Sequence, residues 1–202
     1  MSIAGIVLVI GLYLLFIFFV LLILDTINFL WGWKYIKSNS ESLKQEGCTA
    51  IILVEKRRFF IDRFPIYSSG IPWLIMYLKN NGKPFKVYKW VDKDTFKRII
   101  CDEKVKEAYI FGHGVRHGIK FNMKEIFYYC NFEEEFKTLP KKDYIAQLHC
   151  NRLGGKSLVE IAAKDGFVTN SYRWVYQNWA YCYEKYGGFG CKIVSFILRA
   201  NK

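Results

Sequence analysis

All three histidines of this 202-residue chain lie in two short segments, and one of these segments also carries a cysteine. His113 and His117 belong to the segment YIFGHGVRHG, and His149 directly precedes Cys150 in the segment AQLHCNRLGG. A cysteine thiolate is a strong nucleophile, and an imidazole beside it can take the thiol proton and later donate it to a leaving group. The residue types therefore predict nucleophilic catalysis by Cys150 with His113 as the base, provided that the fold brings the two segments together.

Residues next to this pair suit the same chemistry. Gly114 has no side chain, so its N–H can approach a developing oxyanion together with the N–H of Cys150. A simple turn residue is the other interpretation of Gly114. Three further residues are candidates for contact with a substrate, namely His117, Asn151 and Arg152. The helix expected after Cys150 begins with a capping-box pattern from Ser157 to Glu160, and a helix amino terminus stabilises an anionic sulfur.

Structural roles compete with these catalytic ones. A cysteine in an apolar strand is often a core residue, and His113 could be an ordinary turn histidine. His149 and Cys150 are neighbours on an expected strand, so their side chains should point to opposite faces. We therefore expect His149 to be packed or hydrogen-bonded rather than to act as the base. The same alternation weakens a zinc site built from these histidines and the cysteine, and we expect neither a metal nor an organic cofactor.

Two apolar runs of strand length position the pair. Residues 108–112 (AYIFG) end before His113, and residues 144–149 (YIAQLH) end before Cys150. Further strands are expected at 49–55, 85–91, 167–169 and 192–198, and helices at 71–81, 92–100, 123–137, 157–164 and after the strand at 167–169. This alternation predicts an α/β fold with an open, mostly parallel sheet flanked by helices. Because parallel strands end at the same edge of a sheet, His113 and Cys150 should meet there.

The segments YIFGHG and AQLHCNRLGGKSLVEIA resemble the caspase-like cysteine peptidase superfamily, which includes caspases and legumain-like, clostripain-like and CHAT-type proteases. The resemblance covers about residues 49–198 in the order of elements. Members have a strand that ends in His-Gly and a later strand that ends in the nucleophilic Cys. The resemblance therefore implies a caspase-like fold and gives the corresponding roles to His113, Gly114 and Cys150. The caspase signature Q-A-C-[RQG]-G is absent, and the 37 positions from His113 to Cys150 are fewer than the roughly 50 of caspases, which argues against a true caspase.

The amino-terminal part predicts one transmembrane helix before this fold. Residues 3–24 are an uncharged apolar run long enough, at about 1.5 Å per residue, to cross a hydrocarbon core of roughly 30 Å. The run lacks the basic n-region of a cleaved signal peptide. Because Lys34, Lys37 and Lys44 all follow it, we expect the amino terminus outside and the following domain in the cytoplasm. The predicted organisation is a transmembrane anchor at 1–30, a juxtamembrane tether at 31–47 and the α/β domain at 48–202.

The charge balance points to anionic partners without choosing among them. The chain has 30 basic and 18 acidic residues, a formal charge of +12, which suits nucleic acid, anionic lipid or an acidic substrate. A dense basic group follows the first expected strand, formed by Lys56, Arg57, Arg58 and Arg63. It could face an anion or be a solvated loop. The six cysteines include no CxxC pair, which argues against a zinc ribbon and a redox dithiol.

These observations lead to two functional hypotheses. The first is a membrane-anchored cysteine peptidase that hydrolyses peptide or protein substrates with Cys150 and His113. The second is a noncatalytic signalling domain of the same architecture. Its basic surface would bind an anionic ligand, nucleic acid or a protein partner, and its apolar helix would form a homo-oligomer in the bilayer. Fold analogy alone does not separate a peptidase from a binding domain.

Overall fold

The structure is a computed structural model, and it describes residues 2, 4–17, 19–20, 23, 47–54, 71–115, 117–121, 125–149, 156–169, 181 and 185–186. Several residues of the sequence analysis lie outside this set, namely Cys150, Asn151, Arg152 and the basic group from Lys56 to Arg63. The expected strand at 192–198 and nearly all of the expected tether at 31–47 also lie outside it.

Five strands form one sheet in which every neighbouring pair is parallel. Across the sheet the order is β2 (Phe85–Lys89), β1 (Cys48–Leu53), β3 (Val105–Phe111), β7 (Lys142–Leu148) and β8 (Ala163–Val168). The central strands are apolar runs because the sheet buries both of their faces. The prediction of an α/β fold with a mostly parallel sheet flanked by helices is confirmed.

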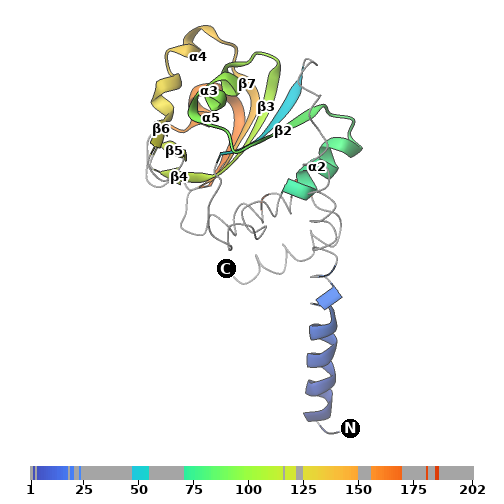
Figure 1. Cartoon of the computed structure of the whole chain (residues 1–202). Coiled ribbons are helices and arrows are strands. Elements are labelled where there is room, and N and C mark those ends of the chain that lie inside the picture. The colour runs from blue at the N-terminus through green and yellow to red at the C-terminus, as the bar shows by residue number, and fades with distance from the viewer. Residues whose placement is uncertain are drawn as a thin grey trace.

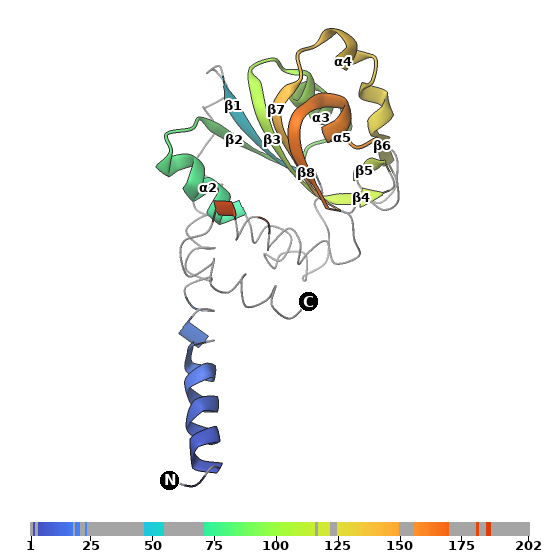
Figure 2. The ribbon, with the colours of Figure 1, turned by 180° about the vertical axis from the view of Figure 1, so that it is seen from behind.

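Helices cover both faces of this sheet (Figure 1). On one face lie α3 (Lys93–Cys101) and α5 (Leu158–Ala162), and the short α4 (Glu135–Thr138) packs its Phe136 against the same core. On the other face lies α2 (Ile71–Asn80), as the view from behind also shows (Figure 2). The sheet is therefore the middle of three layers.

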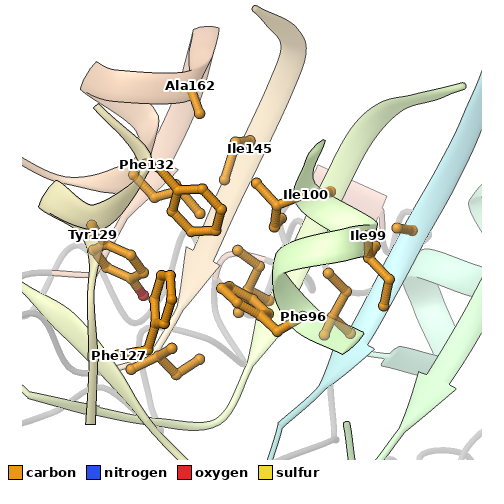
Figure 3. Packing of buried hydrophobic residues seen from close by; sticks show 14 of the residues in the cluster. Phe96, Ile99, Ile100, Phe127, Tyr129, Phe132, Ile145 and Ala162 are labelled. Atoms are coloured by element: carbon orange, nitrogen blue, oxygen red, sulfur yellow. The ribbon is translucent and has the colours of Figure 1, made fainter. Parts of the chain in front are cut away.

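Alternate side chains of the strands fill a core on each face. On the side of α3, the ring of Phe96 meets the rings of Phe121, Phe127 and Phe132 edge-on, with centroids 5.4, 6.0 and 6.1 Å away. Figure 3 shows Phe96, Phe127 and Phe132 of this group close together, with Tyr129 beside them. On the side of α2, side chains of β1, β3 and β7 pack against the helix. These two cores hold the strand ends in place.

A second, three-stranded sheet directly follows β3. Its strands β4 (His113–Val115), β5 (Gly118–Phe121) and β6 (Glu125–Tyr128) are antiparallel and lie in that order. A Cβ atom on Gly118 would lie only 2.4 Å from the carbonyl oxygen of Phe127, so β5 and β6 can approach this closely only with glycine there. This sheet carries the segment with His113 and His117.

The helix expected at 123–137 is wrong. Within the described residues of that range the chain forms β6, a 3-10 turn (Tyr129–Phe132) and then α4. Phe132 and Phe136 have helical spacing, but Phe127 and Tyr129 alternate as on a strand, and these rings enter the core next to α3. The apolar residues of 123–137 therefore follow strand spacing in the first half and helical spacing in the second, and the sequence pattern does not show where the change occurs.

The helix expected at 157–164 is present but shorter, because β8 begins at Ala163. The capping box is confirmed. The Ser157 hydroxyl accepts from the Glu160 N–H at 3.2 Å, and the Glu160 carboxylate accepts from the Ser157 N–H at 2.5 Å. The strand expected at 167–169 is the carboxyl-terminal part of β8.

Residues 4–17 are helical, and the helix lies at the amino-terminal end of the chain (Figure 1). In the described part of the chain, all exposed large apolar side chains except Trp90 and Tyr128 belong to residues 6–23. Among the described residues, no helix combines the length and the apolar character that a bilayer-spanning segment needs. The membrane anchor at 3–24 stays a prediction.

Candidate active site at the carboxyl edge of the sheet

The strand order creates a switch point between β1 and β3. From β1 the chain first moves to β2 on one side and later enters β3 on the other side. Ligands of open α/β sheets bind where such connections diverge, outside the carboxyl ends of the strands. Leu53 and Phe111 are partners at this end of the β1–β3 pair, and the Val54 N–H donates to the Phe111 carbonyl at 2.9 Å.

His113 lies at this switch point. It follows Phe111 by two residues and opens β4, where it is half-buried and pairs with Lys120 of β5. Between Phe111 and His113 the chain passes close to β1, because a Cβ on Gly112 would lie 3.1 Å from the Cβ of Val54. The expected strand at 108–112 is thus confirmed, and the small residue after it lets the chain turn into β4.

The hydrogen-bond alternation of the small sheet shows where the backbone of Gly114 points. The Tyr129 N–H donates to the His117 carbonyl at 2.8 Å, so the ladder bonds between β5 and β6 flank the Gly118–Tyr128 pair. Gly118 therefore directs its own N–H and C=O to Val115 of β4.

The next pair of the β4–β5 ladder is Gly114 with Ile119, and these two residues are therefore not hydrogen-bonded to each other. Gly114 directs its N–H and C=O away from β5, toward the edge of β4 that has no strand beside it among the described residues. This orientation suits a backbone N–H that donates to a ligand. Gly114 is a strand residue here rather than the turn residue of the alternative interpretation.

Cys150 lies outside the described residues, and so do its predicted substrate-contact neighbours Asn151 and Arg152. The described pairing of β7 with β3 ends at Leu148, two residues before Cys150. Phe111 of β3 and Leu148 of β7 are partners in the parallel ladder, and His113 and Cys150 each follow their strand's partner residue by two positions. The described part of β7 ends at the same edge as β3.

His149 is completely buried and takes part in a hydrogen bond. Its Nε2 atom lies 2.5 Å from the hydroxyl oxygen of Tyr129, which is also completely buried. Burial raises the pKa of Tyr129 well above its usual value, so the phenol keeps its proton. The expectation that His149 is packed and hydrogen-bonded is confirmed. This contact links the end of β7 to the small sheet.

The backbone of His149 is held as well. Thr169, which follows β8 and is fully buried, donates its hydroxyl to the carbonyl oxygen of His149 and also lies 3.1 Å from the carbonyl oxygen of Gln147. The Gln147 side chain accepts from the Val159 N–H of α5 at 3.1 Å. The strand end that precedes Cys150 is therefore fixed from β8, from α5 and from Tyr129.

His117 occupies the two-residue turn between β4 and β5, with a φ of +59°. Within the described residues, no group of three or more His, Cys, Asp and Glu side chains is placed to hold a metal ion. His113, His117 and His149 are thus not gathered into one such cluster.

No protein-family model, curated protein or solved structure matches this chain.

The sequence candidates do not include Tyr129, Gln147 and Thr169, although hydrogen bonds of these residues hold the end of β7 in place. Tyr129 falls in the region wrongly expected to be helical, and Thr169 comes 19 positions after Cys150. A polar residue at the end of a neighbouring strand is the only signal that the sequence offers for Thr169. Neither residue has a spacing that indicates its partner.

Proposed function

We propose that this protein is a membrane-anchored, caspase-like cysteine peptidase that hydrolyses peptide bonds. Cys150 is the nucleophile, and His113 is the general base and acid. Residues 3–24 hold the protein in the bilayer with the amino terminus outside, and the α/β domain lies in the cytoplasm. No metal or organic cofactor takes part in this reaction.

One observation carries the proposal. His113 follows β3 at the switch point of a parallel sheet, and the β3–β7 register makes its strand level with the strand that precedes Cys150. A base and a thiol at the carboxyl ends of adjacent parallel strands have the separation in the sheet that a Cys-His pair needs. The edge-directed backbone of Gly114 adds a donor on the same side.

The chemical steps assign one role to each group. His113 takes the thiol proton, and the Cys150 sulfur attacks the scissile carbonyl while the N–H groups of Gly114 and Cys150 stabilise the oxyanion. His113 then gives the proton to the leaving amine as the C–N bond breaks. Water, deprotonated by His113, cleaves the resulting thioester and restores the thiol. His117, Asn151 and Arg152 contact the substrate.

The buried state of His149 supports the choice of His113 as the base. The His149 ring is enclosed and bonded to Tyr129, whereas His113 is half-buried at the edge of the sheet. A base must reach both the thiol and a substrate, which a fully enclosed imidazole does not do.

The experiment compares labelling and hydrolysis in single variants. A peptide with a thiol-reactive electrophile and a broad peptide library are offered to wild type, Cys150→Ala, His113→Ala and His117→Ala. We expect Cys150→Ala to abolish both labelling and hydrolysis, His113→Ala to abolish hydrolysis and His117→Ala to reduce it less. The matched control is Cys101→Ala, a half-buried thiol at the end of α3. Hydrolysis by folded Cys150→Ala protein would exclude the mechanism.

Orientation is tested separately by protease protection in sealed cells. We expect an external protease to remove an amino-terminal tag and to leave the domain from Cys48 onward intact. Digestion of the domain with a protected tag would reverse the proposed topology without bearing on the chemistry.

A noncatalytic binding domain is the second candidate. It is favoured by the basic group at 56–63, which directly follows the β1 end of the switch point in the sequence. An anion held at that edge would fit a signalling or nucleic-acid-binding function. Two results together would favour this candidate. The wild-type protein would show no thiol-dependent hydrolysis, and it would bind an anionic probe such as heparin in a salt-sensitive way.

A further inference from the structure

We propose that Trp90 is a specificity-determining residue of the peptidase, which binds a large apolar or aromatic side chain of the peptide substrate. Trp90 directly follows β2, at the same edge of the sheet as His113. This inference rests on the proposed function, because it takes His113 as the group that marks where the peptide bond is cleaved. It adds a substrate contact that the sequence candidates do not include.

The backbone of Trp90 is the first observation. Its φ of +55° lies in the left-handed region, which glycine adopts without cost and which is rare for a bulky side chain. The chain after it is held in place. Val91 is buried and donates its N–H to the Leu53 carbonyl of β1 at 3.1 Å. Asp92 then accepts from the Thr95 N–H at 2.7 Å and caps α3. The strained residue is therefore fixed between a strand and a helix.

Packing of the Trp90 ring does not offset this strain. The residue is 45% exposed, and beyond residue 23 the described part of the chain exposes only one other large apolar side chain, that of Tyr128. Glycine or asparagine would suit the backbone better, and a polar residue would suit the solvent better. Strained residues that the fold itself does not need are typical of ligand-binding sites. Both the backbone and the exposure of Trp90 thus point to a bound partner.

The place of Trp90 in the fold is that of a ligand site. Leu53 of β1 pairs with both Lys89 of β2 and Phe111 of β3, so the three strands end level. Figure 2 shows these strands side by side. Trp90 comes one residue after Lys89, and His113 comes two residues after Phe111. Both residues therefore lie outside the carboxyl ends of the strands, next to the switch point, where open α/β sheets bind their ligands.

The spacing along this edge fits an extended peptide. Adjacent strands are about 4.8 Å apart, so two strand spacings separate the ends of β2 and β3 by roughly 10 Å. An extended peptide advances about 3.3 Å per residue and covers this distance with about three residues. His113 must come within hydrogen-bond reach of the leaving amine. Trp90 can therefore contact a substrate side chain about three residues from the cleaved bond.

The chemistry of the indole ring determines what the contact recognises. An apolar or aromatic side chain on the ring buries apolar area, and two rings can also stack. Because this contact is remote from the reacting atoms, it stabilises the bound substrate and the transition state alike. Its loss should raise KM and leave kcat nearly unchanged. The burial of one large apolar side chain corresponds to about 10- to 100-fold in affinity.

The test measures hydrolysis by the full-length protein with a peptide library in which each position is varied in turn. We expect wild type to prefer a large apolar or aromatic residue about three positions from the cleaved bond. Trp90→Gly should raise KM about 10- to 100-fold for the preferred peptides, with kcat nearly unchanged, and should remove the preference at that position alone. Trp90→Phe should keep most of the preference, because it keeps an aromatic ring. Trp90→Gly should not lower the melting temperature, since glycine suits the left-handed φ.

Lys104→Gly is the control, because Lys104 is exposed just before β3 and so lies at the opposite edge of the sheet. It should leave KM and the preference unchanged. Wild-type KM and preference in folded Trp90→Gly protein would overturn the role of Trp90 alone. An equal loss of activity toward every peptide, together with a lower melting temperature, would show a structural role and would also overturn it. Wild type without Cys150-dependent hydrolysis would overturn the proposed function, and the substrate contact with it, before any Trp90 variant is compared.

Discussion

His149 illustrates how burial separates two histidines that look equivalent in the sequence. Both His113 and His149 stand within two residues of a strand end. The side chain of His149 is enclosed and meets the Tyr129 hydroxyl, whereas His113 starts an edge strand of a small sheet. The choice of the general base therefore depends on which of the two imidazoles a substrate can reach.

Tyr129→Phe should lower the free energy of unfolding by about 1–3 kcal/mol, because it removes a hydrogen bond to a buried imidazole. Urea denaturation measures this change. Tyr128→Phe is the control. Tyr128 precedes Tyr129 at the end of β6 and is 47% exposed, so its substitution should change stability by less than about 0.5 kcal/mol. Equal effects of the two substitutions would contradict a structural role for the Tyr129–His149 contact.

The burial of Lys142 should make the free energy of unfolding depend on pH. Its side chain is 2% exposed and donates to the carbonyl of Asp102 at 2.5 Å, beyond the end of α3. Burial lowers its pKa below the usual lysine value of 10.5. Between the lowered pKa and 10.5 the unfolded chain binds more protons than the folded one, so this residue makes stability rise with pH across that window.

We therefore expect the stability difference between wild type and Lys142→Met to shift in favour of wild type as the pH rises toward 10.5, measured by urea denaturation at several pH values. Lys141→Met is the control, because Lys141, the residue before Lys142, is exposed. A difference that stays constant with pH would mean that Lys142 is charged alike in both states.

Among the elements, the small sheet depends on one close approach. A Cβ on Gly118 would lie 2.4 Å from the carbonyl oxygen of Phe127, a backbone atom that cannot move without disturbing β6. Gly118→Ala should cost about 3 kcal/mol or prevent folding, as judged by thermal denaturation. Gly11→Ala, at a helical position with no atom within 4 Å of the added Cβ, should not destabilise the protein. A fully stable Gly118→Ala protein would contradict the β5–β6 geometry.

The elements of the large sheet could be predicted from the sequence, whereas those of the small sheet could not. The last four residues of β3, AYIF, are a continuous apolar run, and a strand buried on both faces needs this pattern. β4, β5 and β6 are three or four residues long, too short to establish a period. Their pairing follows from a glycine contact and a positive φ at His117, which the pattern of apolar residues does not encode.

The candidate site could be predicted to the same extent as the strands that carry it. The position of His113 after β3 follows from an apolar run that ends in a short turn. The roles of Tyr129 and Thr169 do not follow, because each depends on a partner 20 residues away in the sequence that only the strand order brings close. Long-range order of this kind is a property of the packed sheet.

For the whole molecule, the testable feature is the apolar amino-terminal segment. Two arginines near its middle, Leu12→Arg with Leu15→Arg, should each cost roughly 2.5–3.5 kcal/mol in a bilayer. We expect the wild-type chain to stay in the membrane pellet after alkaline extraction and the double variant to be released. Ser2→Arg, placed before the apolar run, is the control and should be retained. Retention of the double variant, or release of wild type, would contradict a membrane anchor.

The parallel pairing of β1 with β3 has a consequence for synthesis on the ribosome. Cys48 at the start of β1 pairs with Val105 of β3, about 57 positions later, and the large sheet offers β1 its other partner only at Phe85 and beyond. At about 5–20 residues per second, β1 waits roughly 3–11 s for β3 to be made. During that interval the strongly apolar strand β1 lacks its β3 partner. The nascent chain should therefore depend on chaperones most strongly before residue 111 has left the ribosome.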